Sequence, residues 1–389
     1  MTAIVDLRDD DGDPRRPPAE ECALLSPAFH GAEPSRARPV SVAAVTRRDI
    51  VEIAVTLAFL VVAAICHFAL GDVTTFVVAA VTLAALARLV GGATEQLGAR
   101  LGSGGAGVVQ SGLGNLPELF VCLFALHKGL VNVVQAALVG SILANSVLVL
   151  GIAFIVGGLR NGTQRFSSDR ARTVSTLTLL AAATLAMPSL AHAFHTPAAP
   201  HAQALSIICA GVLLTVFAVM LPSFLRSADN EEHDPPRWSA LTTAIVLAIA
   251  GIGAAFASDW FVNALTPAIH TLHMSEDFAG LVIVAIAGNA VENVVGVQLA
   301  ARNKPDFAIS VIVNSSLQVA LALTPVLVLV SLLFAAHLTL VFPTLLALVL
   351  VISAVLGALI VNDGESTWQE GVVLVGFYVV IASSFWWGT

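Results

Sequence analysis

Long apolar stretches separated by short polar connections make up most of the chain after residue 47. A membrane-spanning helix needs ~20 predominantly apolar residues. The pattern predicts eleven such helices, at residues 50–70, 73–92, 107–127, 130–158, 172–193, 203–224, 238–263, 277–301, 307–335, 338–361 and 368–388. The sequence therefore predicts an all-α polytopic membrane protein.

The composition supports this prediction. The chain is 57% hydrophobic and only 11% charged, whereas soluble domains carry about 25% charged residues. Its 18 Lys and Arg residues are too few and too scattered for a nucleic-acid surface. Residues 1–47 differ, because charges and prolines alternate there without an apolar core. We expect a disordered cytoplasmic tail, and not a signal peptide.

The basic residues predict how the chain is oriented in the membrane. With eleven spans, every Lys and Arg except Lys128 falls on the side of the N-terminus. Cytoplasmic loops carry an excess of Lys and Arg. We therefore expect the N-terminus to be cytoplasmic and the C-terminus to be outside.

A charged connector at residues 225–237 divides the chain into two similar parts. We expect an extra N-terminal helix at 48–71, a first five-helix repeat at 72–224, a cytoplasmic connector at 225–237 and a second five-helix repeat at 238–389. An odd number of spans in each repeat gives the two repeats opposite orientations. This layout is the inverted repeat found in many transporters.

A short polar motif recurs in the two parts. The sequence G-N-L-P-E ends at Glu118, and G-N-A-V-E ends at Glu292, which is 174 residues later. The same offset, without a gap, relates Ser141 to Ser315. Because polar positions coincide inside mainly apolar segments, we interpret the two motifs as equivalent members of an internal repeat.

Carboxylates inside apolar spans are costly, since a charge at the bilayer centre costs ~2.5–3.5 kcal/mol on the lenient insertion scale. No Lys or Arg lies nearby in the spans, so the expected partner is a cation that comes and goes. Each asparagine shares a helix face with its glutamate, while the glycines and Pro117 loosen the helix and free carbonyls. The candidate ion-binding and proton-coupling ligands are Glu118 and Glu292, with supporting ligands Asn115, Asn289, Gly114, Gly288, Ser141, Ser315, Asn145 and Gln318.

These donors are all oxygen ligands, which suits Ca²⁺ with its 6–8 oxygen ligands. The absence of His and Cys from the motifs disfavours Zn²⁺ and Cu⁺. Burial and mutual repulsion favour the protonated form of two close carboxylates, so protons and Ca²⁺ compete for the site. We expect no resident cofactor. Glu95, at the inner end of its span, is a candidate gating residue. Helix packing through small residues is the alternative explanation for Ser141 and its neighbours.

The motif sequences also resemble a known family, the calcium/proton exchangers of the calcium/cation antiporter superfamily. The stretches G-N-L-P-E-L-F, G-S-I-L-A-N-S-V-L-V-L-G, A-G-N-A-V-E-N and N-S-S-L-Q-V-A-L carry the resemblance. It implies eleven spans, inverted repeats and ion binding by Glu118 and Glu292. Two residues depart from the family pattern: Asn293 stands where His is frequent, and Asn314 where Gly is frequent. The ion preference and pH dependence therefore stay open.

Two other functions remain as alternatives. A sodium/calcium exchanger of the same superfamily would use further hydroxyl and acidic groups. A passive cation channel would normally be built from symmetric subunits. The sequence carries no motif that indicates an enzyme. The partners we expect are Ca²⁺, protons and the lipid bilayer, and the Ala-, Val- and Arg-rich composition favours a bacterial plasma membrane.

Overall fold

The structure is a computed structural model that describes residues 46–228 and 236–388. The expected tail at 1–47, apart from its last two residues, and most of the expected connector lie outside the described residues. The first half contains α1 (Arg47–Ala69), α2 (Asp72–Leu113), α3 (Leu116–His127), α4 (Val131–Leu143), η2 (Ala144–Val149), α5 (Leu150–Asn161), β1 (Gln164–Arg165), α6 (Ser168–Ala193), η3 (Ala199–His201) and α7 (Ala202–Ala228).

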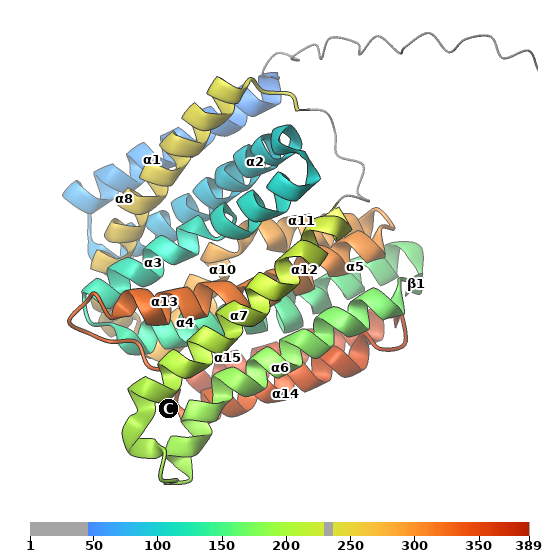
Figure 1. Ribbon diagram of the computed structural model, residues 1–389. Coiled ribbons are helices and arrows are strands. Elements are labelled where there is room, and N and C mark those ends of the chain that lie inside the picture. The colour runs from blue at the N-terminus through green and yellow to red at the C-terminus, as the bar shows by residue number, and fades with distance from the viewer. Residues whose placement is uncertain (1–45, 229–235, 389) are drawn as a thin grey trace, which may run out of the picture. The chain divides into compact units, whose positions relative to one another are not determined.

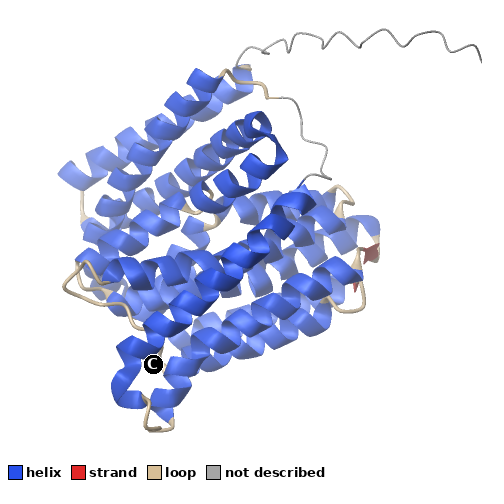
Figure 2. Ribbon diagram, in the orientation of Figure 1, coloured by secondary structure: helices blue, strands red, loops and turns tan. Residues whose placement is uncertain are grey.

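The second half contains α8 (Ala240–Leu272), α9 (Glu276–Phe278), η4 (Ala279–Val284), α10 (Ala285–Gly288), α11 (Ala290–Ala301), α12 (Pro305–Gln318), η5 (Val319–Leu323), α13 (Thr324–Ser331), α14 (Thr344–Ile360), β2 (Glu365–Ser366) and α15 (Trp368–Phe385). The segments η2, η4 and η5 are π-helical turns inside longer helices, and η3 is a short 3₁₀ helix. Figure 2 shows that nearly all of the described chain is helical.

Eight helices of the described residues are long and apolar enough to cross a membrane. A ninth is counted when the pair Glu276–Gly288 and Glu292–Ala301, bent by 63°, is taken as one span. Helices α3 and α14 are apolar but shorter. The protein is therefore an integral membrane protein. Three expected boundaries are wrong. The helix expected at 107–127 begins only at Leu116, and the one expected at 238–263 continues to Leu272. Helix α2 continues past residue 92 to Leu113. No proline interrupts this segment, and a helix satisfies its own backbone polar groups in lipid.

Local sequence signals explain where several helices begin. Thr46 and Asp49 form a capping box at the start of α1, with the Thr46 amide donating to Asp49 Oδ2 at 2.9 Å. Thr367 and Glu370 form a second capping box at α15, with a matching 2.9 Å bond from the Thr367 amide. Such reciprocal bonds satisfy amides that the first turn of a helix leaves free.

The helices pack in pairs that join the two halves of the sequence. Helix α8 lies along α2, which also contacts α1, while α6 lies beside α14 (Figure 1). Helix α4 packs against η4, and α15 packs against α5. At the end where α5 and α14 finish, β1 pairs with β2 in a short antiparallel sheet, with Gln164 opposite Ser366. Apart from the contact between α1 and α2, each pairing connects residues of different halves, so neither half forms its core alone.

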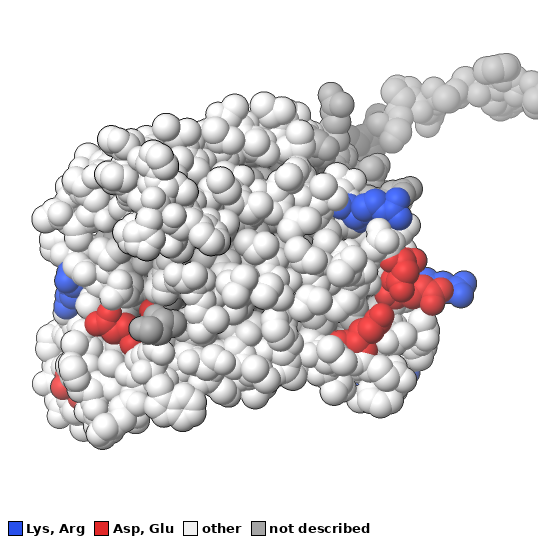
Figure 3. Space-filling view, turned by 90° about the horizontal axis from the view of Figure 1, so that it is seen from below, with Lys and Arg blue, Asp and Glu red and all other residues white. Residues whose placement is uncertain are grey.

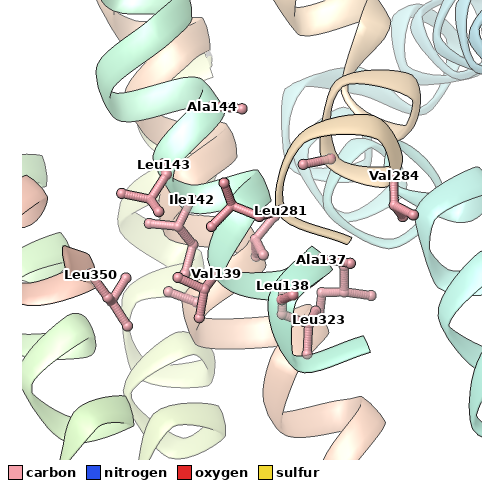
Figure 4. Packing of buried hydrophobic residues seen from close by; sticks show 14 of the residues in the cluster. Ala137, Leu138, Val139, Ile142, Leu143, Ala144, Leu281, Val284, Leu323 and Leu350 are labelled. Carbon is pink, nitrogen blue, oxygen red and sulfur yellow. The ribbon is translucent and has the colours of Figure 1, made fainter. Parts of the chain in front are cut away.

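The centre of the core lies where α4 meets η4. Leu138, Ile142 and Leu281 are among the fully buried side chains there (Figure 4). Two glycines allow this close approach. A Cβ added at Gly140 would collide with the backbone of Leu281, and one added at Gly280 would lie 2.5 Å from the Val133 carbonyl oxygen. Small residues let membrane helices come this close.

Two structural features repeat at the spacing of 174 residues that relates the motifs. Asn115 precedes α3 with φ −95° and ψ 20°, and Asn289 precedes α11 with φ −102° and ψ 22°. The π-helical turn η2 at Ala144–Val149 likewise corresponds to η5 at Val319–Leu323. The motifs thus share a local backbone conformation as well as a sequence.

On the surface seen in Figure 3, the charged side chains avoid the middle of the helices. In Figure 3 they gather at two opposite edges of the visible face, with uncharged residues between. This distribution suits a protein whose middle is covered by lipid, because lipid cannot solvate charge.

Candidate ion-binding site

Helix breaks place both motif glutamates at equivalent positions. Helix α3 begins at Leu116 and α11 begins at Ala290, directly after the two asparagines. Glu118 and Glu292 are consequently the third residues of their helices. The N-terminal end of a helix carries partial positive charge and exposes free amides, which favours a carboxylate there. The backbone therefore supports negative charge at a depth where lipid would oppose it.

A continuous hydrogen-bond network connects Glu118 to the second half of the chain. The Ser141 hydroxyl donates to Glu118 Oε1 and accepts from Asn289 Nδ2 at 3.0 Å. Asn145 Nδ2 donates to Asn289 Oδ1 at 3.1 Å and to Ser315 Oγ at 3.0 Å. All five residues are buried. The network joins α3, α4, η2, α12 and the break before α11, so both repeats contribute to one polar centre.

Several oxygens of this region lack a hydrogen-bond partner among the described residues. Glu118 Oε2 and Asn145 Oδ1 belong to the network, and both residues are 0% exposed. The amide oxygens of Asn293 and Asn314 are buried without a partner as well. Buried polar atoms are nearly always bonded, so the unpaired oxygens of Glu118 and Asn145, which belong to one network, are candidate ligands for a cation or a proton.

The two motifs lie against each other. A Cβ added at Gly288 would be 3.2 Å from Glu118 Cβ, so the second motif's glycine packs directly on the first motif's glutamate. Glu118 and Glu292 are close enough to repel each other when both are ionised. Gly288 is thus needed for close packing here, whatever its effect on helix flexibility.

Glu292 differs from Glu118 in its access to the surroundings. It is half-buried and lines a cavity of about 660 Å³, which Gly114 and Glu95 also line. The cavity wall further includes Glu52 of α1 and Arg88 of α2, whose side chains form an ion pair at 2.7 Å. Glu95 is exposed on this wall. One carboxylate of the pair is therefore enclosed, and the other faces an open space.

The remaining candidate residues lie near the network but contribute differently. Asn115 is buried at its break, yet its side chain makes no hydrogen bond within the described residues. Gln318 is half-buried at the end of α12. Asn314 Nδ2 donates to Ser310 Oγ at 3.2 Å. The structure thus brings Asn289, Asn145, Ser141 and Ser315 together with Glu118, and it leaves Asn115 outside their hydrogen bonds.

Sequence reasoning missed most of the cavity wall. Asp49 and Glu52 of α1 line it, as does Trp238, which precedes α8. Gln96 Oε1 accepts from the Arg237 amide at 2.7 Å and from the Trp238 amide at 3.2 Å, while Arg100 donates to the Trp238 carbonyl. Of these residues, only Gln96 lies in a stretch that resembles the calcium/proton exchangers, A-T-E-Q-L at residues 93–97. For Arg100 the one available signal was its charge near the end of an apolar stretch.

A bundle of apolar helices around buried carboxylates, amides and hydroxyls is the architecture of a membrane ion transporter. The chain belongs to the sodium/calcium exchanger protein family, whose model matches residues 71–226 and 242–387.

Individual relatives extend this result. The chain is 37% identical over 320 residues to the Ca²⁺/H⁺ antiporter ChaA of Bacillus subtilis (strain 168), covering 80% of this chain and 91% of that protein. It is 31% identical over 342 residues to a Ca²⁺/H⁺ antiporter of Synechocystis sp. (strain ATCC 27184 / PCC 6803 / Kazusa), covering 81% and 91%. The structure of native YfkE superposes with a TM-score of 0.74 at 32% identity, covering 87% of this chain and 99% of that chain.

Proposed function

We propose that this protein is a secondary active antiporter that exchanges Ca²⁺ for protons. The observation that carries the proposal is the enclosed Glu118, whose Oε2 has no partner among the described residues although Ser141 holds its other oxygen. Relatives that carry the name Ca²⁺/H⁺ antiporter support the same substrates. The ion site comprises Glu118 and Glu292, and the bonded polar residues around Glu118 support it.

The donor set favours a hard cation. Carboxylate, amide and hydroxyl oxygens are the ligands of Ca²⁺, and Asn145 Oδ1 adds a second unpaired acceptor beside Glu118. Two carboxylates supply the charge that balances a divalent ion. When Ca²⁺ leaves, protons remove the repulsion between Glu118 and Glu292. Occupancy by Ca²⁺ and by protons is therefore mutually exclusive.

The proposed architecture has eleven spans, with α1 as the extra helix and two inverted five-helix repeats at 72–224 and 238–389. The matching breaks at Asn115 and Asn289 support the repeat. The matching turns η2 and η5 and the pairings of α2 with α8 and α6 with α14 support it too. The distribution of Lys and Arg supports a cytoplasmic N-terminus and a C-terminus on the outside, and the proposed location is a bacterial plasma membrane.

Transport proceeds by alternating access. The cavity at Glu292 is the cytoplasmic approach to the site, and Glu95 on its wall helps to gate entry. Rearrangement of the repeats then closes this cavity and opens Glu118 to the other side. An inverted repeat provides two such arrangements of similar energy.

Proteoliposomes that hold a proton gradient test the proposal, with Ca²⁺ uptake read by a trapped dye. An interaction with one charged ligand contributes ~1.5–3 kcal/mol to binding. Losing it lowers Ca²⁺ affinity by about one to two orders of magnitude. Glu118→Gln and Glu292→Gln should therefore each abolish uptake at low Ca²⁺. Asp363→Asn, outside the site, is the control. Full uptake by either glutamate variant would remove that residue from the site.

The same vesicles separate the alternatives. Raising the proton concentration on the Ca²⁺ side should weaken Ca²⁺ uptake, because protons compete for the carboxylates. Uptake driven by a Na⁺ gradient but indifferent to pH would identify a sodium/calcium exchanger. Ca²⁺ movement down its own gradient, without protons or Na⁺ moving in return, would identify a channel.

A further inference from the structure

Histidines gather at one end of the helix bundle. They occupy the last turns of helices and the segments that follow them, at the end opposite to the β1–β2 sheet. They are His67, His127, His192, His195, His201, His270, His273 and His337, which we call the histidine face. The other two histidines of the chain, His30 and His233, lie outside the described residues. All members of the face except His67 are exposed.

Contacts between separate connecting segments join parts of the face. The His127 ring lies 6.0 Å from the ring of Phe334, which joins the end of α3 to the segment after α13. Gln203 Nε2 lies 2.9 Å from His337 Nδ1, which joins the start of α7 to the same segment. Asn132 donates to Glu276 at 3.4 Å and so links the start of α4 to α9.

Permanent positive charges lie at the other end. Arg165 pairs with Glu365 there, and Arg172 donates to Asn362. Among the described Lys and Arg residues, Lys128 alone lies at the histidine face. The acidic groups at or near the face are Asp72 at the start of α2, Asp259 on α8, where it accepts from Asn263, and Glu276 and Asp277 on α9. With neutral histidines this end is therefore net negative.

Histidine is the side chain that ordinarily changes charge between pH 5 and 8. Carboxylates and Lys ordinarily keep their charges over that range. Acidification thus adds positive charge at one end of the molecule and leaves the fixed charges of the other end unchanged. The field of a charged surface changes the local concentration of small ions, and salt screens it. A divalent cation responds twice as strongly as a monovalent one, because its charge is double.

We propose that the histidine face is a pH-dependent electrostatic switch that controls how readily Ca²⁺ reaches the site from the outside. This inference rests on the proposed function and orientation, in which Ca²⁺ leaves and protons enter at this end. In acidic surroundings the face becomes positive and repels Ca²⁺, so released Ca²⁺ does not return. In alkaline surroundings the face is negative, and Ca²⁺ rebinds. The switch thus favours export when a proton gradient is present.

The test uses right-side-out and everted membrane vesicles from cells that express the full chain, with radioactive Ca²⁺ entering from the medium. At low salt, lowering the pH from 8 to 6 should raise the half-saturating Ca²⁺ concentration of the wild type on its outer face more than on its cytoplasmic face. We expect the rise on the outer face to be larger by about threefold to tenfold. This excess should nearly vanish in ~1 M salt, where the Debye length is about 3 Å.

Two variants assign the effect. In the first variant, four histidines are replaced by Gln: His127, His192, His201 and His337. This variant should lose most of the excess shift, and its cytoplasmic uptake should be unchanged. The same four positions changed to Lys should weaken outer Ca²⁺ affinity at both pH values. Arg302→Gln together with Lys304→Gln, at the opposite end, is the matched control and should leave the excess shift intact.

The outcomes are decisive in both directions. If the Gln variant keeps the whole salt-sensitive shift, or if wild type shows no difference between its two faces, the histidine face is not a switch. Uptake on the cytoplasmic face reports whether each variant is folded and active. If wild-type vesicles show no proton-coupled Ca²⁺ transport at all, the proposed function fails, which is a separate result.

Discussion

The two G-N-x-x-E motifs have the same sequence pattern and the same backbone break, but their glutamates lie in different surroundings. Glu118 is 0% exposed and bonded to Ser141, whereas Glu292 is half-buried and faces a cavity of about 660 Å³. The neighbouring helices cause the difference. Helix α3 packs against α8, while part of α11 borders the cavity. Two motifs of the same sequence pattern thus have asymmetric surroundings, which is consistent with the alternating access proposed above.

The largest expected effect concerns access to the two positions. In a background with Cys22, Cys66, Cys122 and Cys209 replaced by Ser, the Glu292→Cys protein should react readily with a water-soluble thiol reagent. Glu118→Cys should react about 100-fold more slowly, because labelling there requires an opening that costs about 2.8 kcal/mol. The rates can be measured by mass spectrometry of the purified protein.

The labelling experiment has an internal control. Denatured protein should label both cysteines at the same rate, which excludes an intrinsic difference in reactivity. Equal rates in the folded protein would show that the two positions do not differ in access, and the comparison between the motifs would lose its basis.

The next largest effect separates the two motif asparagines. Asn289→Ala removes the donor to Ser141 and the acceptor for Asn145. Leaving buried polar groups unpaired costs ~1–3 kcal/mol, so the half-saturating Ca²⁺ concentration should rise by about tenfold or more. Asn115→Ala, the equivalent change in the first motif, should have a smaller effect because Asn115 lies outside the network. A larger effect for Asn115 would indicate that the network rearranges when the ion binds.

A third effect concerns the contact that brings the repeats together. Gly140→Ala places a Cβ against the backbone of Leu281. Overpacking of this kind costs ~1–3 kcal/mol, so the thermal unfolding midpoint in detergent should fall. Gly211→Ala is the matched control, because a Cβ at that helical position would meet nothing within 4 Å. If the two variants were equally stable, the α4–η4 contact would be looser than the structure has it.

Part of this asymmetric site could be predicted from the sequence. The offset between Glu118 and Glu292 indicated equivalent positions, and both are the third residues of their helices. The cost of a carboxylate in lipid predicted a partner for each, and the structure gives Glu118 the Ser141 hydroxyl. The different exposure of the two residues had no sequence signal, because it depends on which helices pack around each motif. The π-helical turns were also unpredictable, since N-S-V-L-V and V-A-L-A-L share no feature that marks them. That α1 lines the cavity was also not predictable, because it depends on how α1 packs against the other helices.

The smallest expected effect lies at the mouth of the open cavity. Arg88 and Glu52 form an ion pair there, with side chains 59% and 37% exposed. Exposed ion pairs contribute only ~0–1 kcal/mol, so Arg88→Gln should leave folding unchanged. It should, however, free the Glu52 carboxylate to attract Ca²⁺. The half-saturating Ca²⁺ concentration of cytoplasmic uptake should therefore fall by about twofold at low salt. Glu52→Gln should act in the opposite direction, and ~1 M salt should cancel both changes.

Opposite signs are the decisive feature, because a loss of structure would lower uptake in both variants. If both variants lowered uptake equally at all salt concentrations, the ion pair would hold α1 and α2 together, and the open side of the site would depend on it for shape and not for charge.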